Sequence, residues 1–275
     1  MADNICVIGA GTIGEAIVKS LLKSKHNGKI TATRRQIEKL RELENLGVAI
    51  TSDNKKAAKE SDITFLCVKP SDVEQVLKEI GEEVKGKLVI STAATIPLKL
   101  YKRTVPETKF VRTMPNIAVL VQESFTAYCC DDDVTNEDKV KVKEILDAMG
   151  VSQEVEEKYM DAITALSGSG PGYISIIIEA LMYAGLKVGL PRNLSLYSSA
   201  QTVLGTGKLA IQTSEHVAKI KDMVTTPGGT TIEAIYELEG SQIRQALMRA
   251  VEQATKKCQK IRETTTKEAE LQAEA

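Results

Sequence analysis

Residues 5–14, Ile5-Cys6-Val7-Ile8-Gly9-Ala10-Gly11-Thr12-Ile13-Gly14, join an apolar run to a glycine-rich segment. The run from Ile5 to Ile8 predicts a short buried strand, and a helix is expected to begin in the glycine-rich segment and to reach about Leu22. In this setting the first glycine makes a tight turn, the second lets a pyrophosphate approach the backbone, and the third packs helix on strand. The alternative is a glycine-rich turn that binds no ligand.

Short apolar runs and helical segments alternate after this motif, which predicts an open, mostly parallel sheet. The run Ile63–Val68 is almost entirely apolar, as expected for a central strand that is covered on both faces. The other expected strands are residues 29–33, 48–50, 87–91, 110–113, 124–130 and, at an edge, 152–155. We therefore expect an α/β Rossmann-type dinucleotide-binding domain over residues 1–163.

Ligands of such sheets bind beyond the carboxyl ends of the strands. The residues that follow the expected strands are therefore candidate cofactor contacts: Val68, Lys69, Ala93, Ala94, Met114, Pro115 and Asn116. Each of them is alternatively an ordinary turn residue, and Lys69 a solvated lysine.

Thr33-Arg34-Arg35 follows the second expected strand, where an NAD site often has an acidic residue for the adenosine ribose. Guanidinium groups instead suit a 2′-phosphate, because they bind phosphate oxygens in pairs. The segment predicts a preference for NADP over NAD, with NAD still possible. Alternatively, both arginines open a solvated helix.

Strand signals end near Asp161, which predicts an all-α domain over residues 164–275. The expected helix Tyr173–Lys187 is apolar on nearly every side and must be covered, so we expect a second subunit against it and a homodimer or larger homo-oligomer. A last helix is expected from Gln242 to about Arg262, followed by a polar tail, Thr264–Ala275, that frays.

Asp222–Ile235 reads DMVTTPGGTTIEAI, in which two glycines and two threonines precede an apolar helical pattern. A helix N-terminus reached through such a loop has free N–H donors and a partial positive charge, so it favours a small anion such as a carboxylate. The alternative is an ordinary capped helix after a Pro-Gly turn.

The composition argues against several classes of protein. The 275 residues are enough for two domains, and a formal net charge of −1 gives no reason to expect nucleic acid or an acidic membrane as a partner. We find no 18-residue apolar run and no secretion signal, and five cysteines without a Cys/His ligand cluster suggest a reduced, cytoplasmic protein without a metal site.

A dinucleotide domain joined to an anion-binding turn suggests hydride transfer to a small carboxylate substrate. Two histidines, His26 and His216, lie outside any motif, which disfavours a hydroxy-acid dehydrogenase that needs a histidine base. A protonated imine is already electrophilic and needs less acid–base catalysis. A hydroxyl such as that of Thr164 suffices to orient or protonate its nitrogen. Lys69 remains an alternative acid or base for a carbonyl reaction.

Five segments together resemble the pyrroline-5-carboxylate reductase family: residues 7–17, VIGAGTIGEAI; 65–70, FLCVKP; 112–116, RTMPN; 166–171, LSGSGP; and 222–235, DMVTTPGGTTIEAI. The resemblance extends from about Ile5 to Cys258. It implies a Rossmann domain, an all-α dimerisation domain, and reduction of 1-pyrroline-5-carboxylate to L-proline with NADPH or NADH, the last step of proline biosynthesis.

The resemblance also implies roles for individual residues. Gly9, Gly11, Thr12, Ile13 and Gly14 would hold the pyrophosphate, and Thr33, Arg34 and Arg35 would lie near the adenosine. Val68, Lys69, Pro70, Ala93, Met114, Pro115 and Asn116 would line the nicotinamide half. Thr226, Gly229, Thr230 and Thr231 would grip the substrate carboxylate, and Thr164 would lie near the imine.

Two other functions stay open at this point. One is a β-hydroxyacid dehydrogenase, although that chemistry needs a helical lysine near residues 167–174, where the sequence has none. The other is a non-catalytic NADP-binding regulator, which would bind the cofactor without turning over the substrate.

Overall fold

The computed structural model describes the backbone of residues 3–274 and the side chains of residues 3–269. Contacts divide the chain into two units. The first unit consists of the chain up to Ser169 together with the segment from Gln253 onward, and the second unit spans Gly170–Glu252. The break thus follows Ser169, six residues after the sequence-based boundary, and the end of the last helix groups with the first unit.

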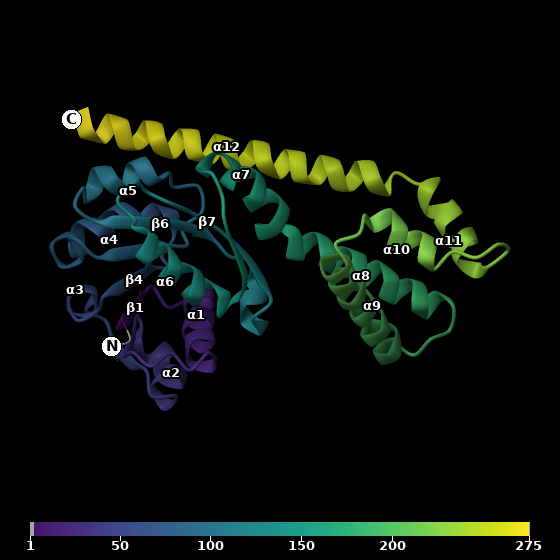
Figure 1. Cartoon of the computed structure of the whole chain (residues 1–275), viewed down its shortest axis with the longest axis horizontal. Coiled ribbons are helices and arrows are strands. Elements are labelled where there is room, and N and C mark those ends of the chain that lie inside the picture. The colour runs from purple at the N-terminus through teal and green to yellow at the C-terminus, as the bar shows by residue number, and fades with distance from the viewer. Residues whose placement is uncertain (1–2, 275) are drawn as a thin grey trace. The chain divides into compact units, whose positions relative to one another are not determined.

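The first unit contains one eight-stranded sheet, of which Figure 1 labels β1, β4, β6 and β7. The strand order is β3-β2-β1-β4-β5-β6-β7-β8. Neighbouring strands are parallel except β6 and β7, whose short connection reverses the chain. This is the expected Rossmann-type arrangement. The strands are β1 (Ile5–Ile8), β2 (Ile30–Thr33), β3 (Ala49–Thr51), β4 (Ile63–Leu66), β5 (Leu88–Ser91), β6 (Lys109–Met114), β7 (Ser124–Cys130) and β8 (Gly150–Glu154).

Helices cover both faces of the sheet, because alternate side chains of each strand point to opposite sides. Val7 of β1 belongs to the core cluster with α1, α2 and α6, whereas Ile8 belongs to the cluster with α3, α4 and α5. The α-helices are α1 (Thr12–Lys23), α2 (Arg41–Asn45), α3 (Asn54–Lys59), α4 (Val73–Ile80), α5 (Leu98–Thr104), α6 (Asn136–Asp147) and α7 (Met160–Ile163). Short 3₁₀ segments are η1 (Ile37–Leu40), η2 (Pro70–Asp72), η3 (Gly81–Val84), η4 (Ile117–Val121) and η5 (Glu157–Tyr159), and η6 (Thr164–Gly168) is a π-helical turn.

The second unit consists of helices and the turns that join them, with no strand among its described residues. It contains α8 (Gly170–Lys187), α9 (Arg192–Thr213), α10 (Val217–Met223), α11 (Thr230–Glu239) and the start of α12 (Ile243–Glu274). The close approach of α8 and α9 requires a glycine: a Cβ on Gly185 would lie 2.0 Å from Oγ of Ser195, which donates to the Met182 carbonyl at 2.6 Å.

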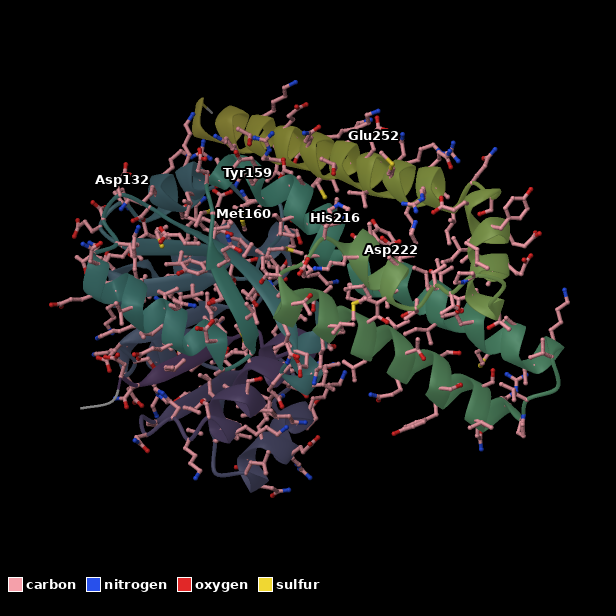
Figure 2. All side chains as sticks on the ribbon, turned by 45° about the vertical axis from the view of Figure 1, so that its right-hand side comes forward. Asp132, Tyr159, Met160, His216, Asp222 and Glu252 are labelled. Atoms are coloured by element: carbon pink, nitrogen blue, oxygen red, sulfur yellow. The ribbon has the colours of Figure 1, made fainter. Side chains whose placement is uncertain are left out.

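The apolar helix α8 has little cover within the second unit. Met182 is buried, but Ile174 and Ile176 are 42% and 67% exposed, and many side chains of this unit point outward (Figure 2). A helix that is apolar all round needs a partner on its open sides, so the exposure fits the expected contact with a second copy.

The expectation of a fraying tail after residue 263 is wrong for the described residues, because α12 continues to Glu274. Strong helix formers fill these turns (residues 267–274 read KEAELQAE), and Ala269 packs on the core cluster beneath α4 and α5. Ala275 lies outside the described residues. None of the helices in the described chain has the length and apolar character that crossing a membrane requires.

Charged side chains join the C-terminal part of α12 to the sheet. Arg112 of β6 is 2% exposed, and its Nη1 donates to Oε1 of Glu157 at 3.0 Å while its Nη2 lies 3.7 Å from Oδ1 of Asp161. Oδ2 of Asp161 accepts from Nε of Arg262 at 2.8 Å. Asp161 therefore bridges α7 to both β6 and α12.

We predict that Asp161→Ala lowers the free energy of unfolding by about 3 kcal/mol, because removing one partner leaves buried Arg112 short of a counter-charge. Urea denaturation at fixed protein concentration measures the loss. Glu239→Ala, which removes the exposed acceptor of Arg244, is the matched control and is expected to leave the midpoint unchanged. Equal midpoints for both variants would contradict the bridging role.

Candidate active site

The carboxyl ends of β1, β2 and β4 lie level, since Ile8 pairs in register with both Thr33 and Leu66. The loops that leave these strands enclose a cleft of about 680 Å³. Seven of the predicted cofactor residues line it together: Gly9, Gly11, Thr33, Arg34, Arg35, Val68 and Lys69.

The three glycines of the motif have different steric surroundings. Gly9 has φ +82°, and a Cβ there would lie 2.7 Å from Cγ1 of Val68 and 2.9 Å from the Cys67 carbonyl oxygen. A Cβ on Gly14 would meet the Gly9 oxygen at 3.0 Å, but a Cβ on Gly11 would find no atom nearer than 4.0 Å. The protein itself therefore requires Gly9 and Gly14, whereas the space over Gly11 is open.

The first turn of α1 faces this space with free donors. Gly11 is the N-cap and no side chain caps the helix, so the early N–H groups of Thr12, Ile13 and Gly14 have no intrahelical acceptor. Ile13 packs on the core, so it offers its backbone alone. Cys67 also lines the cleft, and burial raises the pKa of its thiol to about 12, which keeps it protonated and neutral there.

Both arginines of the cleft have acidic partners that the sequence did not reveal. Nη1 of Arg34 donates to Oε1 of Glu15 at 3.0 Å and to the Ala10 carbonyl at 3.3 Å. Nη2 of Arg35 donates to Oδ2 of Asp72 at 2.5 Å.

Asn54 is a further cleft residue missed by the sequence argument; its Oδ1 accepts from Oγ1 of buried Thr33 at 2.6 Å. It follows β3, so the rule of carboxyl strand ends would have found it. That rule does not predict which acidic residue of another loop forms an ion pair with an arginine.

Ala93, Met114, Pro115 and Asn116 lie outside the lining of this cleft. Asn116 is engaged in local bonds: Oδ1 accepts from the Ala118 N–H at 3.0 Å, and Nδ2 donates to the Ser167 carbonyl at 3.2 Å. Met114 lies against Gly168, where a Cβ would approach its Cε to 2.6 Å. These two residues thus hold the η6 turn against the end of β6.

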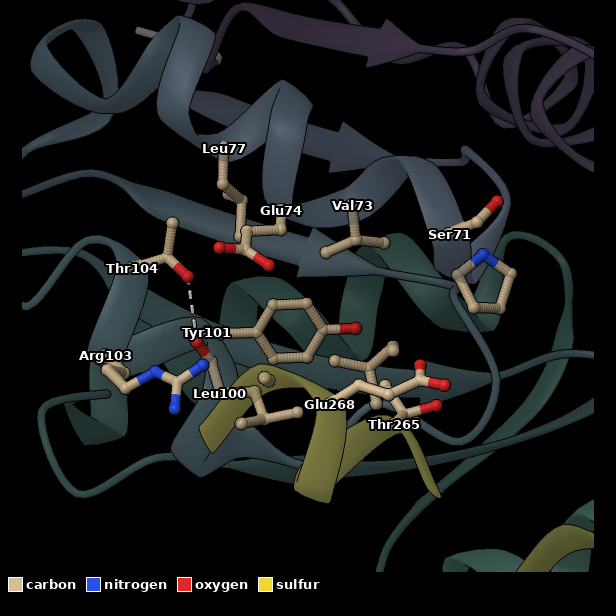
Figure 3. A pocket seen from close by; sticks show the side chains of 13 residues that line it. Ser71, Val73, Glu74, Leu77, Leu100, Tyr101, Arg103, Thr104, Thr265 and Glu268 are labelled. Carbon is tan, nitrogen blue, oxygen red and sulfur yellow. Dashed lines mark hydrogen bonds between the residues drawn. The ribbon is translucent and has the colours of Figure 1, made fainter. Parts of the chain in front are cut away.

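Pro70 lines a separate pocket of about 230 Å³. Figure 3 shows the Tyr101 ring at its centre, with Val73 and Leu77 of α4 on one side and Leu100, Thr265 and Glu268 on the other. Ser71 borders both hollows, so the η2 turn separates this pocket from the glycine-lined cleft.

Thr164 begins η6, a wide helical turn of a kind often found at functional sites. It is 8% exposed, and its Oγ1 donates to the Met160 carbonyl at 2.7 Å. The hydroxyl proton is therefore held by the backbone, and the oxygen's lone pairs are left to accept a hydrogen bond.

The predicted anion-binding loop leads into α11. Gly228 has φ +69°, the N–H of Gly229 donates to the Thr226 carbonyl at 3.0 Å, and Gly229 is an N-cap without a capping side chain. Within the described chain, the hydroxyls of Thr226, Thr230 and Thr231 make no hydrogen bond. Free hydroxyls and free N–H groups thus meet at one helix end. No cluster of metal-ligating side chains occurs among the described residues.

The contrast between the glycines gives a paired prediction. Gly11→Ala should fold with near-normal stability but weaken NADPH binding about tenfold or more, because its methyl fills the space over the helix end. Gly9→Ala should lower the melting temperature, because no room exists for its Cβ. Thermal melts and fluorescence titration with NADPH test both; normal NADPH binding by Gly11→Ala would contradict the site.

Two family models match the chain: "NADP oxidoreductase coenzyme F420-dependent" over residues 4–95 and "Pyrroline-5-carboxylate reductase dimerisation" over residues 157–261. The pyrroline-5-carboxylate reductase of Methanosarcina acetivorans is 40% identical over 267 residues, which cover 94% of this chain and 98% of that protein.

Solved structures agree with this match. A pyrroline-5-carboxylate reductase of Coxiella burnetii is 32% identical with a TM-score of 0.89, covering 94% of this chain and 98% of its own. The Plasmodium falciparum pyrroline carboxylate reductase with NADP bound is 31% identical with a TM-score of 0.83, and the match covers 93% of this chain and 97% of that one. The chain belongs to the pyrroline-5-carboxylate reductase family.

Proposed function

We propose that this protein reduces 1-pyrroline-5-carboxylate to L-proline, the last step of proline biosynthesis, with NADPH as the preferred reductant and NADH as a second one. The bound cofactor supplies the hydride. The observation that carries the proposal is the pair of helices, α1 and α11, that have a glycine at the N-cap and no capping side chain. One end suits a pyrophosphate and the other a carboxylate.

The substrate end is built for a small anion. Thr230 and Thr231 occupy the first two positions of α11, so their N–H groups point out of the helix end beside their own hydroxyls. The turn before them is fixed by Gly228 and Gly229, which places the Thr226 hydroxyl at the same end. We propose that Thr226, Gly229, Thr230 and Thr231 hold the substrate carboxylate.

The acceptor is a protonated imine rather than a ketone. Both histidines have structural positions, since Nε2 of His26 bonds the Asp3 carbonyl at 2.8 Å and Nδ1 of His216 accepts from the Ala218 N–H at 3.2 Å. An imine that carries its own proton needs orientation more than a strong acid. We assign that orientation to Thr164, whose oxygen is left as an acceptor for the imine N–H.

The helical part belongs to a dimerisation family, so the protein is a homo-oligomer. We propose that a dimer is its smallest unit and that the exposed face of α8 lies within the interface. A cytoplasmic location is also proposed, supported by five free cysteines, and the net charge of −1 supports a small molecule rather than nucleic acid as partner.

The direct test is the absorbance of NADPH. Addition of 1-pyrroline-5-carboxylate should oxidise NADPH and yield proline in equal amount. NADPH binding without turnover would instead favour a regulator, and oxidation of a β-hydroxyacid by NADP⁺ would favour the dehydrogenase alternative. Either of these results would overturn the proposal.

A second prediction concerns the carboxylate loop. Thr231→Ala should raise the KM for pyrroline-5-carboxylate about tenfold, the effect of losing one hydrogen bond to a charged group worth about 1.5 kcal/mol. Thr225→Ala is the neighbouring control, because its hydroxyl already donates to the Lys221 carbonyl at 2.7 Å. A KM that responds equally to both substitutions would count against the loop.

A further inference from the structure

Each of the two arginines at the expected adenosine end of the cleft is paired with a carboxylate. Arg34 is paired with Glu15 and Arg35 with Asp72, and both arginines and Asp72 line the cleft. The two ion pairs differ, however, in how firmly each arginine is held.

Arg34 is fixed. Its side chain is 29% exposed, and its guanidinium bonds both Glu15 and the Ala10 carbonyl. The side chain of Arg35 is 88% exposed and its partner in the structure is Asp72, so this pair is weak and screened by solvent.

Asp72 is held in place independently of Arg35. It ends the η2 turn, its N–H donates to the Lys69 carbonyl at 2.9 Å, and its Oδ1 accepts from the Ser71 hydroxyl at 3.1 Å. Its side chain is 29% exposed. When Arg35 moves, the carboxylate therefore stays at the wall of the cleft.

We propose that Asp72 limits the preference for NADPH over NADH that the arginines confer, a proposal that rests on the cofactor assigned under the proposed function. A 2′-phosphate draws Arg35 away from Asp72 and is repelled by the carboxylate that remains. A free 2′-hydroxyl can donate to that carboxylate, as it does to the acidic residue of NAD sites. Asp72 thus restores, from the loop after β4, the acid that is missing after β2.

The test is Asp72→Asn, with binding of NADPH and NADH measured separately by fluorescence titration of the full-length protein. The Kd for NADPH should fall about threefold to fivefold, because an exposed ion pair no longer competes for Arg35. The Kd for NADH should rise about fivefold to tenfold, because the amide is a weaker acceptor for the ribose hydroxyl.

Glu74→Gln is the matched control. It removes the same charge two residues away, but Glu74 lies in the Tyr101 pocket and pairs with Lys78 at 2.7 Å. Its ratio of Kd values should equal that of the unmodified protein. Arg35→Ala is the complementary variant: NADPH binding should weaken while NADH binding is kept.

A ratio of Kd values that is the same in Asp72→Asn as in Glu74→Gln would overturn the assignment, as would parallel weakening of both cofactors. These titrations need no substrate. If the ratio of Kd values shifts but the protein does not turn over pyrroline-5-carboxylate, the role of Asp72 stands and the proposed function is refuted. If the protein turns over the substrate but the ratio does not shift, the proposed function stands and the role of Asp72 is refuted.

Discussion

Unpaired backbone N–H groups at the start of a helix are the physical feature on which the site depends. Two helices elsewhere in the first unit satisfy such groups with a side chain: Asp53 caps α3 by accepting from the N–H of Lys56, and Thr135 forms a capping box with Asp138 on α6. At α1 and α11 a glycine stands at that position instead. Both helix ends therefore keep their donors and partial positive charge for a ligand.

The parts of this arrangement that depend on adjacent residues could be predicted from the sequence. Ile5–Ile8 and Ser124–Cys130 both form strands at the expected bounds, because a doubly covered sheet leaves largely apolar runs in the sequence. The motif from Gly9 to Gly14 indicated the cleft, since strand, turn and helix are consecutive there.

Features that join distant segments could not be predicted in this way. Asp72 and Arg35 are 37 residues apart, and Asp161 and Arg262 are 101 apart, so neither ion pair leaves a local pattern. Asn116 has the expected position after β6, but its amide binds the η6 turn rather than lining the cleft. The segment after residue 263 is too polar to predict a packed helix, although Ala269 packs on the core cluster beneath α4 and α5.

The central claim is that the dinucleotide and the substrate carboxylate are each held by a glycine-capped helix end. A crystal structure of the protein with NADP⁺ and L-proline tests it most directly. We expect the pyrophosphate over Gly11 and the proline carboxylate within hydrogen-bond distance of the N–H groups of Thr230 and Thr231. Proline bound away from residues 226–231, or a dinucleotide bound away from residues 9–14, would contradict the account.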